Sequence, residues 1–166
     1  MRKPNIAILG ATGVVGREIT SITTELGIEF ESIKFLSSAK SAGSKIEFQG
    51  ETYTVEEATP DSFNGVDIVM ASAGGGTSKH FAPEIVKRGG LIIDNSSAFR
   101  MEDDVPLVVP ECNAEDALNR PRGIIANPNC TTIMMVVVLQ PLEKISHIKR
   151  IHVASYQSAS GAGAAA

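Results

Sequence analysis

Short apolar runs alternate with amphipathic segments along most of this chain. The runs that we expect to form strands cover residues 5–9, 32–36, 66–71, 91–94, 107–109 and 123–126. Apolar residues recur at helical spacing over 14–26, 77–88 and 131–144. Apolar strands that alternate with helices form βαβ units. The sequence therefore predicts an α/β fold with a doubly wound, mostly parallel sheet of the Rossmann type.

Smaller features fit between these elements. Residues 45–55, with Gly50 at their centre, predict a hairpin. Thr77 is expected to cap the helix that follows it, and Pro83 predicts an early kink in that helix. Residues 148–156 predict one more strand, ahead of a stretch rich in glycine and alanine.

A glycine-rich turn, Gly10–Gly16 (GATGVVG), joins the first strand to the first helix. Glycine permits a tight turn and lets a pyrophosphate approach the backbone, at the helix N-terminus that binds it. Glycines alone are weak support, since any tight turn favours them. Their place between the first strand and the first helix makes the motif specific, and it predicts a dinucleotide site.

The end of the second strand bears on which dinucleotide binds. NAD sites usually have Asp or Glu there for the ribose 2′-hydroxyl, whereas this chain has Ser37-Ser38-Ala39-Lys40-Ser41. Hydroxyls and an ammonium suit a 2′-phosphate, which a carboxylate would repel. We therefore expect NADP rather than NAD, although a polar surface loop would have the same composition.

Cys130 follows the strand at 123–126 and an Asn-Pro-Asn turn, and a helical segment comes next. Its thiol would lie at or just before a helix N-terminus, where unpaired N–H groups and the helix dipole favour an anion. Thiols in such positions tend to react as thiolates. A buried cysteine that acts as a small hydrophobe is the ordinary alternative. Because open α/β sheets bind ligands where their strands end, we take Cys130 as the candidate nucleophile.

Composition limits the remaining function classes. The 166 residues are 43% hydrophobic and 20% charged with a net charge of −4, as in a soluble globular protein. We find no basic patch, no apolar run long enough for a bilayer and no signal peptide. We therefore expect no nucleic-acid partner, no membrane and a cytoplasmic location. Cys112 and Cys130 provide neither a disulfide framework nor a metal site.

Four segments together resemble the N-terminal half of the aspartate-β-semialdehyde dehydrogenase family. They are Gly10–Gly16, Asp94–Arg100 (DNSSAFR), Asn127–Thr132 (NPNCTT) and Tyr156–Gly163 (YQSASGAG). The resemblance implies NADPH-dependent reduction of β-aspartyl phosphate to aspartate semialdehyde and phosphate, on the route to lysine or diaminopimelate, threonine, methionine and isoleucine. It also implies a homodimer or homotetramer for the full-length protein. The alternatives are N-acetyl-γ-glutamyl-phosphate reductase and a short NADP-binding module without chemistry of its own.

The resemblance also assigns roles to residues. It makes Cys130 the thiolate that forms a thioester and Gln157 the group that helps to orient the acyl intermediate. Arg100 and Asn129 match the groups that hold the substrate phosphate. The positions that match the cofactor site are Gly10, Thr12, Gly13, Val14, Gly16, Ser37, Ser38, Lys40, Ala73, Gly74, Ser160 and Gly161.

The family's acid/base histidine and the Arg and Glu that bind the amino-acid end of the substrate lie in its second half. We therefore expect an NADP-binding domain over 1–130, the incomplete start of a catalytic and dimerisation domain over 131–166, and no activity from this chain alone. His80, His147 and His152 are expected to be surface or helix residues. The helix from Thr131 is apolar nearly all round, so we also expect the isolated chain to associate.

Overall fold

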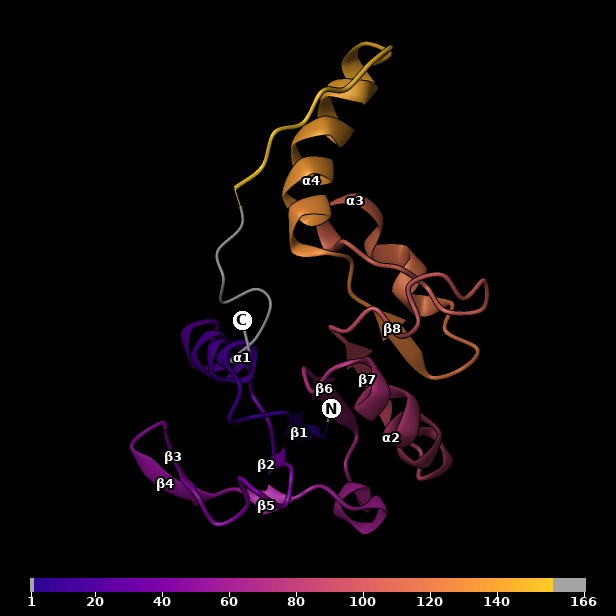
Figure 1. Ribbon diagram of the computed structural model, residues 1–166. Coiled ribbons are helices and arrows are strands. Elements are labelled where there is room, and N and C mark those ends of the chain that lie inside the picture. The colour runs from indigo at the N-terminus through magenta and orange to yellow at the C-terminus, as the bar shows by residue number, and fades with distance from the viewer. Residues whose placement is uncertain (1, 157–166) are drawn as a thin grey trace.

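A parallel sheet forms the centre of the computed structural model, which describes residues 2–156. Its strands lie in the order β5-β2-β1-β6-β7-β8, which is the order of dinucleotide-binding folds. Their bounds are β1 Asn5–Leu9, β2 Ser32–Ser37, β5 Glu56–Glu57, β6 Ile68–Ala71, β7 Leu91–Asp94 and β8 Ile124–Ala126. The prediction of a doubly wound, parallel α/β sheet is confirmed (Figure 1).

Two helices cover opposite faces of this sheet, α1 (Val14–Glu25) and α2 (Gly75–Lys87). Side chains alternate between the faces of a strand, so β1 contributes to two separate cores. Ile8 belongs with Phe35 to the core on the α1 face, whereas Leu9 belongs to the other core, which contains Ile85 of α2. The central strands β1 and β6 are largely apolar because both of their faces are covered.

The predicted hairpin is confirmed as β3 (Lys45–Phe48) and β4 (Glu51–Thr54), which pair antiparallel. Its turn is Gln49-Gly50, with φ of 51° and 82°. Two successive positive φ values belong to the tight turn that matches strand twist, and glycine adopts the second without strain. Phe48 then packs against Phe35 with ring centroids 5.6 Å apart, which attaches the hairpin to the α1 face of the sheet.

Two predicted strands are wrong. Residues 107–109 form only an isolated bridge, Leu107 to Ala126, because Pro106 and Pro110 on either side have no N–H to extend the pairing. Residues 148–156 have no regular structure, since no strand within residues 2–156 pairs with them. The short helix α3 (Pro110–Asn113) and the 3₁₀ turns η1 (Pro60–Phe63) and η2 (Ala114–Leu118) complete the described elements.

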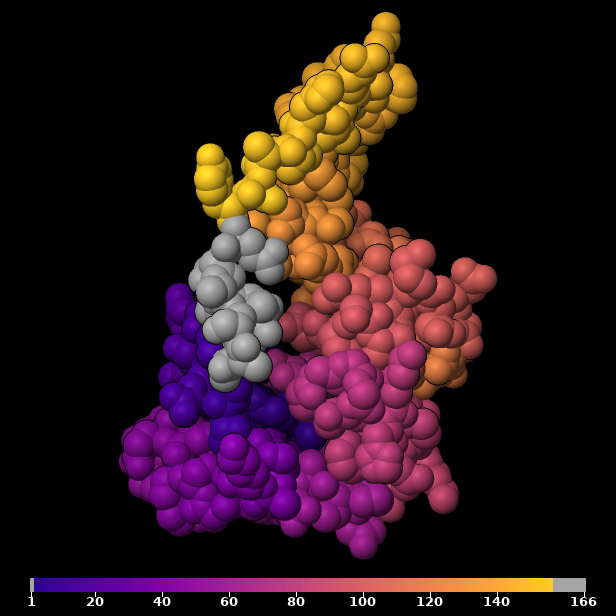
Figure 2. Space-filling model, in the orientation of Figure 1, coloured from indigo at the N-terminus to yellow at the C-terminus, as the bar shows by residue number. Residues whose placement is uncertain are grey.

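Helix α4 (Cys130–Ile145) projects from the rest of the molecule (Figure 2), and α3 lies beside its first turns (Figure 1). None of its residues is buried. Met134, Val138, Leu142 and Ile145 are half or more exposed, and their spacing puts them on one face of the helix. No helix in residues 2–156 is both long enough and apolar enough to cross a membrane. Among residues 2–156, these four side chains thus form an exposed apolar stripe, which we call the apolar stripe of α4.

We expect the isolated chain to self-associate through this apolar stripe, because exposed contiguous apolar surface favours association. Light scattering should give a mass above the 17.5 kDa of one chain. A Met134→Glu/Val138→Glu variant should shift the population toward the monomer. Met101→Glu, which changes an exposed methionine outside the stripe, should leave the mass unchanged. A wild-type chain that remains monomeric at high concentration would contradict this prediction.

Candidate active site

A cavity of about 440 Å³ lies at the carboxyl ends of β1, β2 and β6. The chain leaves β1 toward β2 on one side and later returns to β6 on the other, and open α/β sheets bind ligands at such a reversal. The predicted cofactor residues that line this cavity are Gly10, Thr12, Gly13, Ser37, Ser38 and Ala73. The structure therefore brings together the turn after β1, the end of β2 and the turn after β6.

The glycine turn lets three pieces of backbone meet at the base of this cavity. Gly10 has a φ of +88°, and a Cβ atom there would lie 2.7 Å from the carbonyl oxygen of Ser72. A Cβ atom on Gly16 would lie 2.1 Å from the carbonyl oxygen of Gly10. Gly13 is the N-cap of α1, and the first turn of that helix holds no acidic residue. The N–H groups in the first turn of α1 are therefore available to an anion, and no carboxylate of that turn competes for them.

Hydroxyl groups border the far side of the same cavity. The Thr12 and Ser37 hydroxyl oxygens lie 2.8 Å apart, which joins the glycine turn to the end of β2. The Ser38 carbonyl accepts from the N–H groups of Ser41 and Ala42, so residues 38–42 form a tight turn with the exposed Lys40 inside it.

Some predicted cofactor residues do not line the cavity. Val14 and Gly16 lie in the first turn of α1, Lys40 lies in the exposed turn and Gly74 is the N-cap of α2. Gln157, Ser160 and Gly161 lie outside the described residues.

No sequence pattern predicted Glu57, the one charged residue among the described residues that line the cavity. Glu57 of β5 lines it, because β5 pairs in parallel with β2 and places Glu57 opposite Ser37. A carboxylate therefore does occur beside the end of β2, although it comes from the neighbouring strand. A strand of only two residues leaves no periodic signal in the sequence, so this pairing had no sequence signature.

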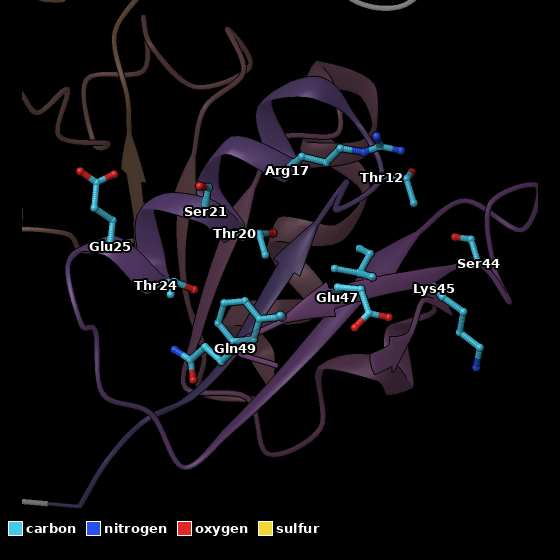
Figure 3. A pocket seen from close by; sticks show the side chains of 12 residues that line it. Thr12, Arg17, Thr20, Ser21, Thr24, Glu25, Ser44, Lys45, Glu47 and Gln49 are labelled. Atoms are coloured by element: carbon cyan, nitrogen blue, oxygen red, sulfur yellow. The ribbon is translucent and has the colours of Figure 1, made fainter. Parts of the chain in front are cut away.

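A second, larger cavity of about 690 Å³ lies between α1 and the β3–β4 hairpin (Figure 3). Arg17 and Thr12 lie at one end of it and Glu25 lies at the other. Lys45 and Glu47 add one charge of each sign. The larger cavity shares Thr12 with the cavity at the strand ends and lies along the flank of α1.

At the end of β7, the fully buried carboxylate of Asp94 organises the loop that follows. It accepts hydrogen bonds of 2.6 Å from the hydroxyls of Ser78 and Ser96. The Asp94 carbonyl accepts from the N–H of Asn127 at 2.8 Å, which ties the end of β7 to the turn after β8. A buried carboxylate needs such donors, because leaving it without them costs several kcal/mol.

Arg100 is anchored by main-chain carbonyls of these two turns. Its Nε donates to the carbonyl of Asn127 at 2.8 Å, and its Nη2 donates to the carbonyl of Asn95 at 3.1 Å. The Asn127 side-chain amide donates to the Asn95 side chain. These bonds hold the half-buried guanidinium in one orientation. They use Nε and Nη2, which leaves Nη1 as the nitrogen not engaged by these two carbonyls.

Cys130 is the first residue of α4, and its side chain is exposed. Asn129 caps the helix, since its Oδ1 accepts from the Thr131 N–H at 3.0 Å. The prediction of a thiol at a helix N-terminus is confirmed, and the alternative of a buried structural cysteine is wrong. Cys130 follows Asn127 by three residues, so the Cα atoms of the two residues are at most about 11 Å apart. The thiol therefore lies on the same turn that anchors Arg100.

The other candidate groups lie elsewhere, as expected. His80 is exposed and packs edge-on against Phe81 of α2. His147 contacts Glu143 at 2.7 Å near the end of α4, roughly 24 Å of helix from Cys130. The Ile148 N–H, and after it His147, lower the pKa of the Glu143 carboxyl. Residues 2–156 contain no group of three or more His, Cys, Asp or Glu side chains that could hold a metal ion.

We expect Gly16→Ala to destabilise the fold by about 3 kcal/mol, because its Cβ would overlap a backbone oxygen that cannot move aside. Gly76→Ala is the matched control, since Gly76 is helical with open space around it. That change should leave the stability unchanged or raise it by up to about 1 kcal/mol. Chemical denaturation measures both free energies of unfolding, and equal effects of the two changes would rule out this steric explanation.

Asp94→Ala should lower the free energy of unfolding by about 3 kcal/mol, because the Ser78 hydroxyl would stay buried without its acceptor. The control is Asp103→Ala, which removes an exposed carboxylate. This change should alter the free energy of unfolding by less than about 0.5 kcal/mol. A small effect of Asp94→Ala in urea denaturation would show that the hydrogen bonds of Asp94 with Ser78 and Ser96 contribute little to stability.

Comparison with known proteins agrees with this architecture. The semialdehyde dehydrogenase NAD-binding domain matches residues 5–120. Aspartate-semialdehyde dehydrogenase from Synechocystis sp. is 55% identical over 97% of this chain and 47% of that protein. The crystal structure of aspartate semialdehyde dehydrogenase II from Vibrio cholerae has a TM-score of 0.95 at 42% identity, covering 99% of this chain and 49% of that one. The enzyme from Candida albicans, crystallised with NADP, has a TM-score of 0.68 at 26% identity, over 87% of this chain and 48% of that one.

The chain spans about half the length of the curated relatives it matches. Its glycine turn lies at the start of the matched domain, and its sheet has the strand order that binds dinucleotides. The resemblance noted from the sequence motifs is therefore confirmed, and the chain belongs to the semialdehyde dehydrogenase family.

Proposed function

We propose that this chain is the cofactor- and nucleophile-bearing part of an NADP-dependent aspartate-semialdehyde dehydrogenase. The observation that carries the proposal is the shared turn of residues 127–130, which anchors Arg100 and presents the exposed Cys130 at the start of α4. A nucleophile on the turn that anchors a guanidinium suits an acyl phosphate, because phosphate must be held while the thiolate attacks.

In the proposed reaction the Cys130 thiolate attacks the acyl carbon of β-aspartyl phosphate. The carbon–oxygen bond to phosphate breaks, phosphate leaves with the bonding electrons, and a thioester forms on Cys130. NADPH, when bound, supplies the hydride that reduces this thioester carbon. Cleavage of the carbon–sulfur bond then releases aspartate semialdehyde and restores the thiolate. The N-terminus of α4 stabilises the thiolate at both stages.

Arg100 and Asn129 are proposed to hold the substrate phosphate. Two carbonyls occupy Nε and Nη2 of Arg100, so Nη1 is the donor that we assign to a phosphate oxygen. Asn129 uses Oδ1 to cap α4, so its amide nitrogen is the group that we assign to phosphate. Gln157 retains its proposed role in orienting the acyl group, on the strength of the sequence motif.

For the cofactor, the cavity at the strand ends supports a nicotinamide dinucleotide, and we propose NADP. Ser38 and Lys40, at the end of β2, are assigned to the 2′-phosphate, with the pyrophosphate at the glycine turn. The relative from Candida albicans was crystallised with NADP, which supports the same choice. Ser160 and Gly161 are proposed to lie near the nicotinamide.

We also propose that residues 131–166 begin the catalytic and dimerisation domain of a longer protein, whose general base lies beyond this chain. The exposed apolar stripe of α4 supports this division, because such a surface is normally covered. The full-length protein is proposed to be a cytoplasmic homodimer or homotetramer that serves lysine, threonine, methionine and isoleucine synthesis.

The test is NADP- and phosphate-dependent oxidation of aspartate semialdehyde by a full-length protein that contains this chain. We expect activity from that protein and none from the 166-residue chain, which lacks the proposed base. Cys130→Ala should lower kcat by at least about 10³-fold, as loss of a catalytic nucleophile does. Cys112→Ala, the matched control, removes the half-buried thiol of α3 and should retain most of the activity.

Activity that survives Cys130→Ala would contradict the proposed nucleophile. A full-length protein that prefers N-acetyl-γ-glutamyl phosphate would instead be the related reductase. A protein that binds NADP but turns over neither substrate would be a binding module.

A further inference from the structure

We propose that Glu57 binds the adenosine ribose of the cofactor and sets the balance between NAD and NADP. This inference rests on the proposed dinucleotide site and adds a specificity-determining residue to it. The end of β2, where a carboxylate usually selects NAD, holds only Ser37, Ser38 and Lys40. Strand β5 supplies that missing carboxylate from the adjacent position in the sheet.

The pairing register determines which way Glu57 faces. Glu57 lies directly opposite Ser37 in the parallel pairing of β2 with β5, at a backbone separation of about 4.8 Å. Directly paired residues share one face of a sheet, and the Ser37 hydroxyl on that face contacts Thr12 of the glycine turn. Glu57 is accordingly among the residues that line the cavity, together with Gly10 and Ser38.

The preceding residue, Glu56, faces the other way. It pairs with Leu36, which packs with Phe63 on the α2 face of the sheet, and it is not among the cavity residues. Both glutamates are exposed and carry the same charge. Their different faces therefore separate a contact with the cofactor from a general effect of negative charge near the cavity.

A carboxylate in this place acts differently on the two cofactors. It accepts a charge-assisted hydrogen bond from a ribose hydroxyl, which favours NAD. It repels the 2′-phosphate of NADP across a short distance. Lys40 in the neighbouring turn offsets this repulsion, so both dinucleotides bind. We infer that the chain accepts NAD as well as NADP, with dissociation constants within about tenfold of one another.

Calorimetric titration of the 166-residue chain with NAD⁺ and with NADP⁺ tests this inference. Glu57→Gln keeps the shape of the side chain and removes its charge. It should weaken NAD⁺ binding and strengthen NADP⁺ binding, so that the ratio of the two dissociation constants changes by about tenfold or more. Glu56→Gln should leave that ratio within about twofold of the wild-type value. Thermal melting confirms that both variants fold.

The outcomes separate this inference from the function on which it depends. A wild-type chain that binds neither dinucleotide would overturn the proposed cofactor site and Glu57's role with it. Normal binding with an unchanged ratio in Glu57→Gln would overturn the role of Glu57 alone. An equal change in both variants would assign the effect to overall charge and would likewise overturn it.

Discussion

The position of β1 between β2 and β6 is the constraint on which the rest of this structure depends. Hydrogen bonds on both sides hold it in register with Ser32–Leu36 and with Ile68–Ala71, so three strands end at one edge. The chain can leave that edge only by a turn tight enough for α1 to pack back on the sheet. The contact of Gly16 with the Gly10 carbonyl and of Gly10 with Ser72 allows this turn. The cavity at the strand ends follows from that geometry.

The sequence was sufficient for features that depend on local pattern. The apolar runs predicted the central strands, and GATGVVG and the Asn-Pro-Asn-Cys turn located the two parts of the site. Features that depend on distant partners were not predictable. The strand predicted over 148–156 was wrong because a strand needs a neighbour to pair with. The strand predicted over 107–109 was wrong for a local reason, since the prolines on either side limit its pairing to one bridge. Glu57 was missed because only its register against Ser37 brings it to the cavity.

Within residues 2–156, neither Asp94 nor Arg100 forms an ion pair, and neutral groups hold both side chains in place. Asp94 is satisfied by hydroxyls and an N–H group, and Arg100 is held by two carbonyls. Neutral dipoles fix these side chains but do not neutralise the guanidinium, which keeps its full charge for an anionic ligand. A carboxylate partner would hold Arg100 as firmly but would weaken its attraction for phosphate.

The anchors of Arg100 have an evolutionary consequence, because both are main-chain atoms. A carbonyl oxygen is present whichever side chain the residue carries, so substitutions at Asn95 and Asn127 cannot delete the acceptors themselves. Sequence drift at these two positions would alter the amide pair between them and leave the guanidinium's principal supports in place. Related proteins can therefore differ here and still orient the same arginine, provided that the backbone of both turns retains its path.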